Sequence, residues 1–217
     1  MLNFGNEVIE WVASVKFLGI DIDENLLWNL QSKKVFNKLA KSTYILNCVK
    51  NTLPTYCMKS LYYSLFYTHL TYVLHVWGPS ISKANQNCLT KAQKKVIRIV
   101  NNTSYTAHTN ELFKKLQILK FPEIIEVELC KFVYSIIRRI SPTPLNSIIQ
   151  LNSETHQYNT RNKNDICIPK HKSTKFNNSF IIKGPSLWSA LPYDVKSKYN
   201  CIHGLANKLK KLKIDNY

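Results

Sequence analysis

The chain has 217 residues, 45% of them hydrophobic and 12% aromatic, so it is large enough and apolar enough to bury a core. That aromatic content excludes wholesale disorder, and a total of five glycines disfavours a Gly-rich phosphate-binding loop. Thirty Lys and Arg residues against thirteen Asp and Glu give a net charge of +17, which would attract a polyanionic partner. A generically Lys-rich, solvated surface is the alternative explanation of this charge.

The positive charge is unevenly distributed along the chain. Acidic residues predominate in residues 1–30, whereas no Asp or Glu occurs between Asn25 and Asn110. The six cysteines show no CxxC spacing, and no apolar secretory segment follows Met1. We therefore expect reduced thiols and an intracellular protein, nuclear or cytoplasmic, that is not secreted.

The expected elements begin with β structure and continue as helices. The β-branched, apolar stretch Val12–Ile22, with Gly19 inside it, predicts a short strand or hairpin arm. Apolar residues at helical spacing then predict amphipathic helices at 28–48, 55–77, 83–101, 110–116, 122–140 and 202–214. The polar segment 150–183 is expected to be either an extended arm packed along the helices or partly disordered, and a short helix is expected near Trp188.

One of these stretches must be weighed as a membrane span. Between Lys59 and Lys83 there is no Asp, Glu, Lys or Arg, and the stretch is rich in Leu, Tyr and Val. Serine, threonine and histidine interrupt it, whereas a spanning helix needs about 20 predominantly apolar residues. We therefore expect 55–77 to be the central, most buried helix of the domain, and we expect no membrane partner.

Short stretches in a consistent order resemble the reverse transcriptases of non-LTR (LINE-type, jockey-like) retrotransposons. The first runs from Val15-Lys-Phe-Leu-Gly-Ile-Asp-Ile-Asp23 to Trp28 and is similar to the segment that joins palm and thumb in that family. The others are Leu53-Pro54 to Trp77-Gly78, Gln93-Lys-Lys-Val-Ile-Arg-Ile99 with the residues up to Leu119, and His156-Gln-Tyr-Asn-Thr-Arg161 with the residues up to Pro192. Together they cover nearly the whole chain.

The resemblance implies a mainly α fold: a helical thumb-like domain, a small N-terminal β element and an extended basic C-terminal tail. Residues 1–24 would be a remnant of the palm–thumb junction, 25–140 the thumb-like domain, and 141–217 the tail with its C-terminal helix. The Asp-Asp pair that holds the family's catalytic metal would lie upstream, and no Asp-Asp pair occurs in this sequence. We therefore expect no enzymatic activity from this chain alone, and divalent metal only in the missing palm.

Two rows of cations are the candidate nucleic-acid-binding surfaces. In the helix expected at 83–101, basic side chains fall opposite the apolar ones: Lys91, Lys94, Lys95 and Arg98. A second row flanks the apolar stripe of the first helix: Lys34, Lys38 and Lys41. In a reverse-transcriptase thumb such rows would follow the phosphates of an RNA or RNA–DNA duplex without reading its sequence.

Further candidates lie in the tail and at the N-terminal β element. Tyr158, Arg161 and Lys163 combine an aromatic ring with cations, as single-strand binders do. By resemblance, Phe17, Leu18 and Gly19 would belong to the region that holds the primer end, and the palm and fingers of a parent polymerase would be a further partner. Each basic row has a solvated face as its alternative explanation.

No residue is assigned to catalysis or to a metal or other cofactor in this chain. Asp21 and Asp23 follow a predicted strand, where carboxylates commonly stabilise turns. The spacing of Cys167, His171, Cys201 and His203 does not match the usual zinc clips. Two other interpretations remain open: a host-retained basic module that binds nucleic acid or a protein, and a relic reading frame without function.

Overall fold

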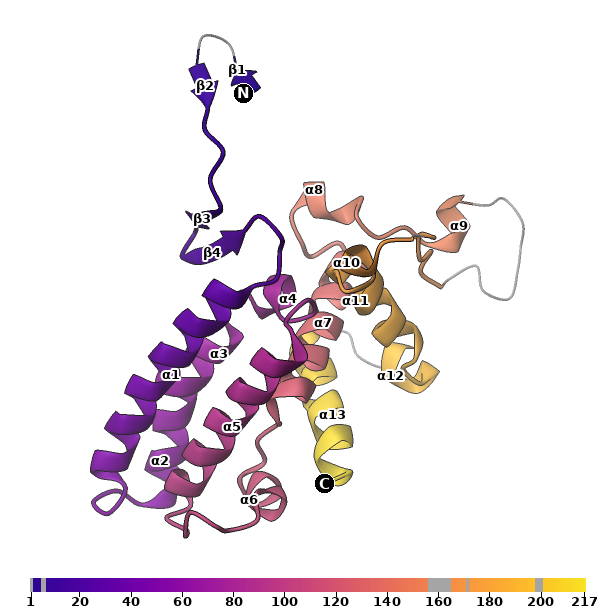
Figure 1. Cartoon of the computed structure of the whole chain (residues 1–217). Coiled ribbons are helices and arrows are strands. Elements are labelled where there is room, and N and C mark those ends of the chain that lie inside the picture. The colour runs from indigo at the N-terminus through magenta and orange to yellow at the C-terminus, as the bar shows by residue number, and fades with distance from the viewer. Residues whose placement is uncertain (1, 5–6, 156–164, 171, 198–200) are drawn as a thin grey trace.

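The computed structural model describes residues 2–4, 7–155, 165–170, 172–197 and 201–217 (Figure 1). The fold is mainly helical, with small antiparallel β elements near the N-terminus, as predicted. The longer helices are α1 (Asn29–Val49), α5 (Lys83–Val100), α6 (Thr109–Leu116), α7 (Phe121–Ile137), α11 (Phe180–Ser189) and α13 (Ile202–Asp215). Shorter ones are α8 (Thr143–Asn146), α9 (Asn152–Thr155), α10 (Thr174–Asn177) and α12 (Tyr193–Ser197).

The N-terminal β structure consists of two hairpins that project from one end of the helices (Figure 1). In the first, β1 (Leu2–Phe4) pairs with β2 (Glu7–Ile9); in the second, β3 (Ser14–Phe17) pairs with β4 (Ile20–Asp23). The second hairpin confirms the predicted hairpin arm. Its turn is Leu18-Gly19, with φ of 46° and 81°; positive φ at both positions is what a type I′ hairpin turn requires.

Helices α1 and α5 lie side by side, and the chain from Thr55 to Trp77 lies behind them (Figure 1). This stretch is not the single helix that was predicted. It is divided into α2 (Thr55–Leu61), a π-helical turn η1 (Tyr62–Tyr67), α3 (Thr68–Thr71) and α4 (Leu74–Trp77). The helical path breaks at Val73, whose backbone is left-handed at φ 49°. The break leaves the Tyr72 carbonyl oxygen without a helical N–H donor, and the Trp77 indole N–H donates to this oxygen at 2.9 Å instead.

The central helix is α7, which corrects the prediction that residues 55–77 would fill that place. Helix α7 packs against α4, α5, α11 and α13, and its buried side chains are Phe121, Ile124, Ile125, Val127, Leu129, Cys130, Val133, Tyr134 and Ile136. Along 55–77 one side remains exposed, for example at Ser64 and Tyr72. The difference follows from the packing, because other helices cover several sides of α7, whereas the 55–77 stretch lies at the edge of the helical bundle.

Helix α11 brings the segment after Ile140 back onto α7. Gly184 permits the contact, since a Cβ atom there would meet Phe180 Cε2 at 2.8 Å and Val133 Cγ2 at 3.0 Å. Trp188 is buried beside Tyr134, with ring centroids 6.2 Å apart. The short helix expected near Trp188 is therefore confirmed as α11, which begins at Phe180. The described residues of 150–183, expected to be extended or partly disordered, also contain the short helices α9 and α10.

The C-terminal helix α13, which was predicted, is anchored by Tyr217, two residues beyond its end at Asp215. The Tyr217 hydroxyl accepts a hydrogen bond from the Lys120 backbone N–H at 2.9 Å and donates one to the Glu123 carboxylate. Lys213 forms an ion pair with Glu126. These contacts fix α13 along α7. Within the described residues, no helix combines the length and the apolar character that crossing a bilayer requires.

Candidate nucleic-acid interface

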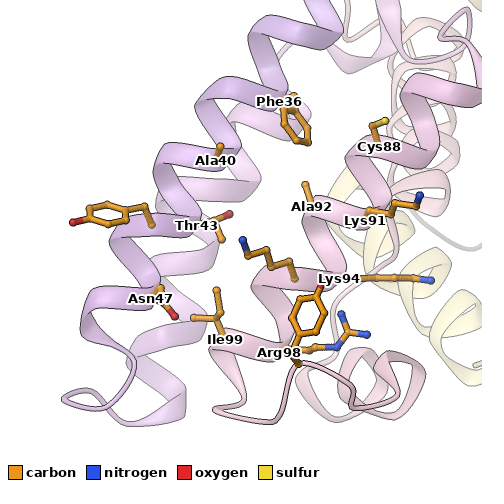
Figure 2. A pocket seen from close by; sticks show the side chains of 13 residues that line it. Phe36, Ala40, Thr43, Asn47, Cys88, Lys91, Ala92, Lys94, Arg98 and Ile99 are labelled. Carbon is orange, nitrogen blue, oxygen red and sulfur yellow. The ribbon is translucent and has the colours of Figure 1, made fainter.

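A groove of about 690 Å³ runs between α1 and α5 (Figure 2). We call it the α1–α5 groove; its lining residues are Phe36, Ala40, Thr43, Tyr44, Asn47, Cys88, Lys91, Ala92, Lys94, Lys95, Arg98, Ile99 and Tyr105. Figure 2 shows Ala40, Thr43 and Asn47 of α1 across from Ala92 and Ile99 of α5. None of the described residues that line the groove is acidic.

The predicted basic row of α5 forms one side of this groove. Ser82 caps the helix by accepting a hydrogen bond from Asn85 N at 3.2 Å, as expected for a serine at that position. The apolar face is buried, and the row faces away from it: Lys91 and Lys95 are exposed, Lys94 and Arg98 half-buried. The structure therefore brings together the whole row that the sequence singled out.

Arg98 differs from the lysines of its row because it also holds a loop. Its Nε donates to the Ala107 carbonyl oxygen at 2.9 Å, and its guanidinium lies 5.7 Å from the centroid of the Tyr105 ring. A cation over an aromatic face at this distance is attracted by the ring electrons. The contacts set the 101–108 loop against α5 and place Tyr105 at the edge of the groove.

The second basic row lies on the other flank of α1, in a groove of about 620 Å³ beside strand β3. We call it the hairpin groove; its lining residues are Ser14, Val15, Lys16, Asp21, Leu30, Lys33, Lys34, Asn37, Lys38 and Lys41. Lys38 and Lys41 are exposed. Lys34 Nζ instead lies 2.8 Å from Asp21 Oδ2, so much of its charge is balanced within the chain.

The residues that the resemblance connects with a primer end form the tip of the second hairpin. Phe17 and Leu18 are 62% and 73% exposed, so they contribute little to a core. The tip is nevertheless fixed: Tyr72 Oη donates to the Leu18 carbonyl oxygen at 2.8 Å, and Lys34 Nζ donates to that of Gly19 at 3.0 Å. These contacts hold an apolar tip beside the second basic row.

His69 lies close to the same row, in a small depression that Lys38 also lines. Burial, and secondly the positive charge of Lys38, lower the pKa of His69 below its ordinary value. The imidazole therefore favours its neutral form and adds little to the positive charge of this surface near neutral pH.

The remaining sequence candidates do not gather into a site. Tyr158, Arg161 and Lys163 of the tail lie outside the described residues, as does His171. Asp23 stabilises a turn, since its Oδ1 accepts from Leu27 N at 2.7 Å. In the part of the chain that the structure describes, no group of His, Cys, Asp and Glu side chains is arranged to hold a metal ion.

The structure adds residues that sequence reasoning missed. Lys16 and Lys33 join the second row in the hairpin groove, and the adjacency of Lys33 to Lys34 in the sequence was a signal for it. Three aromatic residues join the first row: Phe36, Tyr44 and Tyr105. Nothing in their spacing indicates a common site, because the groove exists only once α1 and α5 are packed together.

Comparisons with known proteins identify no relative: no family model matches the sequence, and neither a curated protein nor a solved structure matches it.

Proposed function

We propose that this chain binds RNA or an RNA–DNA duplex through the basic surface of α1 and α5. In this proposal it is the thumb-and-tail part of a non-LTR retrotransposon reverse transcriptase. It holds template and primer inside the cell while a palm carried elsewhere supplies the metal-dependent chemistry, and it is not itself an enzyme. The observation that carries the proposal is the α1–α5 groove: the basic row of α5 forms one side of it, and none of its described lining residues is acidic.

Charge distribution is the first support. Helix α1, the 55–77 stretch and α5 lie within the part of the sequence that contains no Asp or Glu. The cations of α5 therefore meet no carboxylate from α1 or from the 55–77 stretch. An uncompensated basic surface concentrates polyanions and releases their counterions on binding.

Geometry is the second support. Basic rows lie on both flanks of α1, one in the α1–α5 groove and one in the hairpin groove. Lysines point their charge into solvent from rigid helices, which suits contact with phosphates rather than with base edges. Such an interface would position a duplex and would be nearly indifferent to its sequence.

The proposal is tested by measuring the affinity of the purified chain for a labelled RNA–DNA hybrid. Replacing Lys91, Lys94 and Lys95 with Ala should weaken binding roughly 10- to 100-fold at moderate salt, because each replaced lysine no longer neutralises a phosphate. Arg98 is left in place, since its contacts to Ala107 and Tyr105 hold the loop.

A matched control removes the same charge elsewhere. Lys114 and Lys115 of α6 and Lys211 of α13 are exposed and line neither groove, so their combined replacement with Ala should change affinity only slightly. If both triple variants lose affinity equally, binding depends on net charge and not on this surface. A folded wild-type chain that fails to bind the hybrid even at low salt would refute the proposal and favour a protein-interaction module.

A further inference from the structure

We infer that the α1–α5 groove receives unpaired bases of a nucleic-acid strand, which stack on Tyr44 and Tyr105 while the adjoining phosphates contact Lys91, Lys95 and Arg98. This inference rests on the proposed function, because it assumes that nucleic acid reaches this surface. It goes further in assigning the groove to a single-stranded segment, for instance where a strand extends beyond a duplex end.

Exposed aromatic side chains gather around the groove. Tyr44 is 71% exposed and Tyr105 is 78% exposed, while Phe36 between the two helices is 42% exposed. Single exposed rings are ordinary on a protein surface, but several of them around one concavity indicate a binding surface. Tyr44 stands on α1 and Tyr105 on the loop after α5, so the rings come from both walls of the groove.

The floor between the rings has space for a flat ligand. Ala40 and Ala92 contribute only methyl groups, and Ile99 adds an apolar surface; Figure 2 shows all three between the two helices. The volume of about 690 Å³ lies within the range of pockets that hold small organic ligands. A base in the groove would therefore contact an apolar surface with an aromatic ring at its edge.

Cations and rings are interleaved here, and one such pair is already assembled. The Arg98 guanidinium lies 5.7 Å from the Tyr105 ring centroid, and its Nε is held by the Ala107 carbonyl oxygen at 2.9 Å. The loop ring is thus positioned before any ligand binds, which lowers the ordering cost of binding. Aromatic platforms combined with a positively charged track are the means by which proteins hold single strands without sequence preference.

Charge complementarity favours a nucleic-acid strand over a peptide as the occupant. A strand carries a negative phosphate at every nucleotide, matching a groove whose charged lining residues are all cationic. A typical peptide helix carries both signs of charge, and its cations would meet no carboxylate here. An acidic amphipathic peptide is the competing occupant that the experiment must separate.

The test compares a blunt RNA–DNA hybrid with the same hybrid carrying a single-stranded extension. The wild-type chain should bind the extended hybrid more tightly. The preference is measured as the ratio of the affinities for the two hybrids. Tyr44→Ala and Tyr105→Ala should each reduce that ratio by about tenfold, because each removes one stacking ring, whereas a loss that follows from the Tyr105 contact with Arg98 affects both hybrids and cancels in the ratio. Tyr44→Phe and Tyr105→Phe should keep it, because the ring and not the hydroxyl does the stacking.

The matched control is Tyr56→Ala. Tyr56 is 73% exposed, close to the value for Tyr44, but it lies on α2 and does not line the groove. All three tyrosines are exposed, so the variants should fold, which circular dichroism can verify.

The outcomes separate this inference from the proposed function. Equal binding of blunt and extended hybrids, with no effect of Tyr44→Ala or Tyr105→Ala, overturns the single-strand inference and leaves duplex binding standing. Failure of the wild-type chain to bind either hybrid overturns both. If the tyrosine variants weaken capture of an acidic amphipathic peptide but not of the extended hybrid, the groove is a peptide site and the inference is wrong.

Discussion

The Lys34 ammonium lies 2.8 Å from the Asp21 carboxylate, and it also donates a hydrogen bond to the Gly19 carbonyl oxygen at 3.0 Å. One cation of the second basic row therefore ties the β3–β4 hairpin to α1. Both side chains are about one-quarter exposed, so the pair contributes on the order of 1 kcal/mol or less to stability. Its larger consequence is electrostatic, because the charge of Lys34 is already balanced.

This pairing predicts unequal roles within the second row. Lys41→Ala should weaken binding of an RNA–DNA hybrid several-fold, whereas Lys34→Ala should weaken it less. Asp21→Asn should strengthen binding, since it removes a carboxylate from the hairpin groove and frees the Lys34 charge. Equilibrium titrations at fixed salt measure all three. Equal losses of affinity for Lys34→Ala and Lys41→Ala would show that the ion pair does not persist in the bound state.

Replacing Gln93 in the core is predicted to lower the free energy of unfolding strongly. Its fully buried amide donates to Tyr62 Oη at 3.0 Å and to the Leu119 carbonyl oxygen at 2.8 Å, and it accepts from Phe121 N at 2.8 Å. Gln93→Leu removes these bonds and leaves a buried N–H and carbonyl without partners, so it should cost about 2–4 kcal/mol.

Urea unfolding measures that cost, and Gln86→Leu on the same helix is the control. Gln86 is only half-buried, so its replacement should change the free energy of unfolding by less than about 1 kcal/mol. Similar values for the two variants would contradict the role assigned to Gln93.

The cysteines provide a footprint of the α1–α5 groove without any mutation. All six are free thiols; Cys88 is exposed within the groove, and Cys48 is exposed outside it. Bound nucleic acid should slow maleimide labelling of Cys88 several-fold and leave Cys48 unchanged. Burial raises the pKa of the Cys130 thiol to about 12, so Cys130 should stay unlabelled near neutral pH in either state. Protection of Cys48 and not Cys88 would place the ligand elsewhere.

His75 is predicted to make the fold acid-sensitive. Its ring packs on Phe132 with centroids 4.4 Å apart, and burial lowers the pKa of His75; the nearby Glu128 opposes this shift and Lys131 adds to it. Since the folded pKa lies below that of the unfolded chain, stability from the neutral ring is present above about pH 6.5. It is lost as the pH falls toward the folded value.

Denaturant unfolding between pH 7.5 and pH 5 tests this effect. His75→Phe keeps an aromatic ring against Phe132 but cannot be protonated, so its free energy of unfolding should fall less steeply with acidification than that of the wild type. Parallel curves for the two proteins would exclude His75 as a source of the acid sensitivity.

The elements that could be predicted well from the sequence are those whose ends and faces are indicated by residues within the element or next to it. Helix α5 has a capping serine before it and separates its cations from its apolar residues, so both its position and its basic row could be read directly. The hairpin at β3–β4 carries its own turn signal in Gly19. The break at Val73 could not be predicted, because neither glycine nor proline marks it and the left-handed residue is β-branched.

The candidate site was predictable only where one helix carries it alone. Lys91, Lys94 and Lys95 share a helical face, which spacing reveals. Tyr44 and Tyr105 reach the same groove from distant parts of the chain, so their association depends on how α1 packs against α5. The partner of Lys34 likewise comes from the hairpin, and no pattern within α1 shows that its charge is balanced.

The most direct measurement of the central claim is the salt dependence of binding to a blunt RNA–DNA hybrid. The logarithm of the affinity should fall linearly with the logarithm of salt concentration for the wild-type chain, as counterions are released. Combined replacement of Lys91, Lys94 and Lys95 with Ala should make that slope shallower by about one for each phosphate that is no longer neutralised, whereas the Lys114, Lys115 and Lys211 control should keep it. Equal slopes for wild type and the α5 variant would contradict the claim that this surface binds nucleic acid.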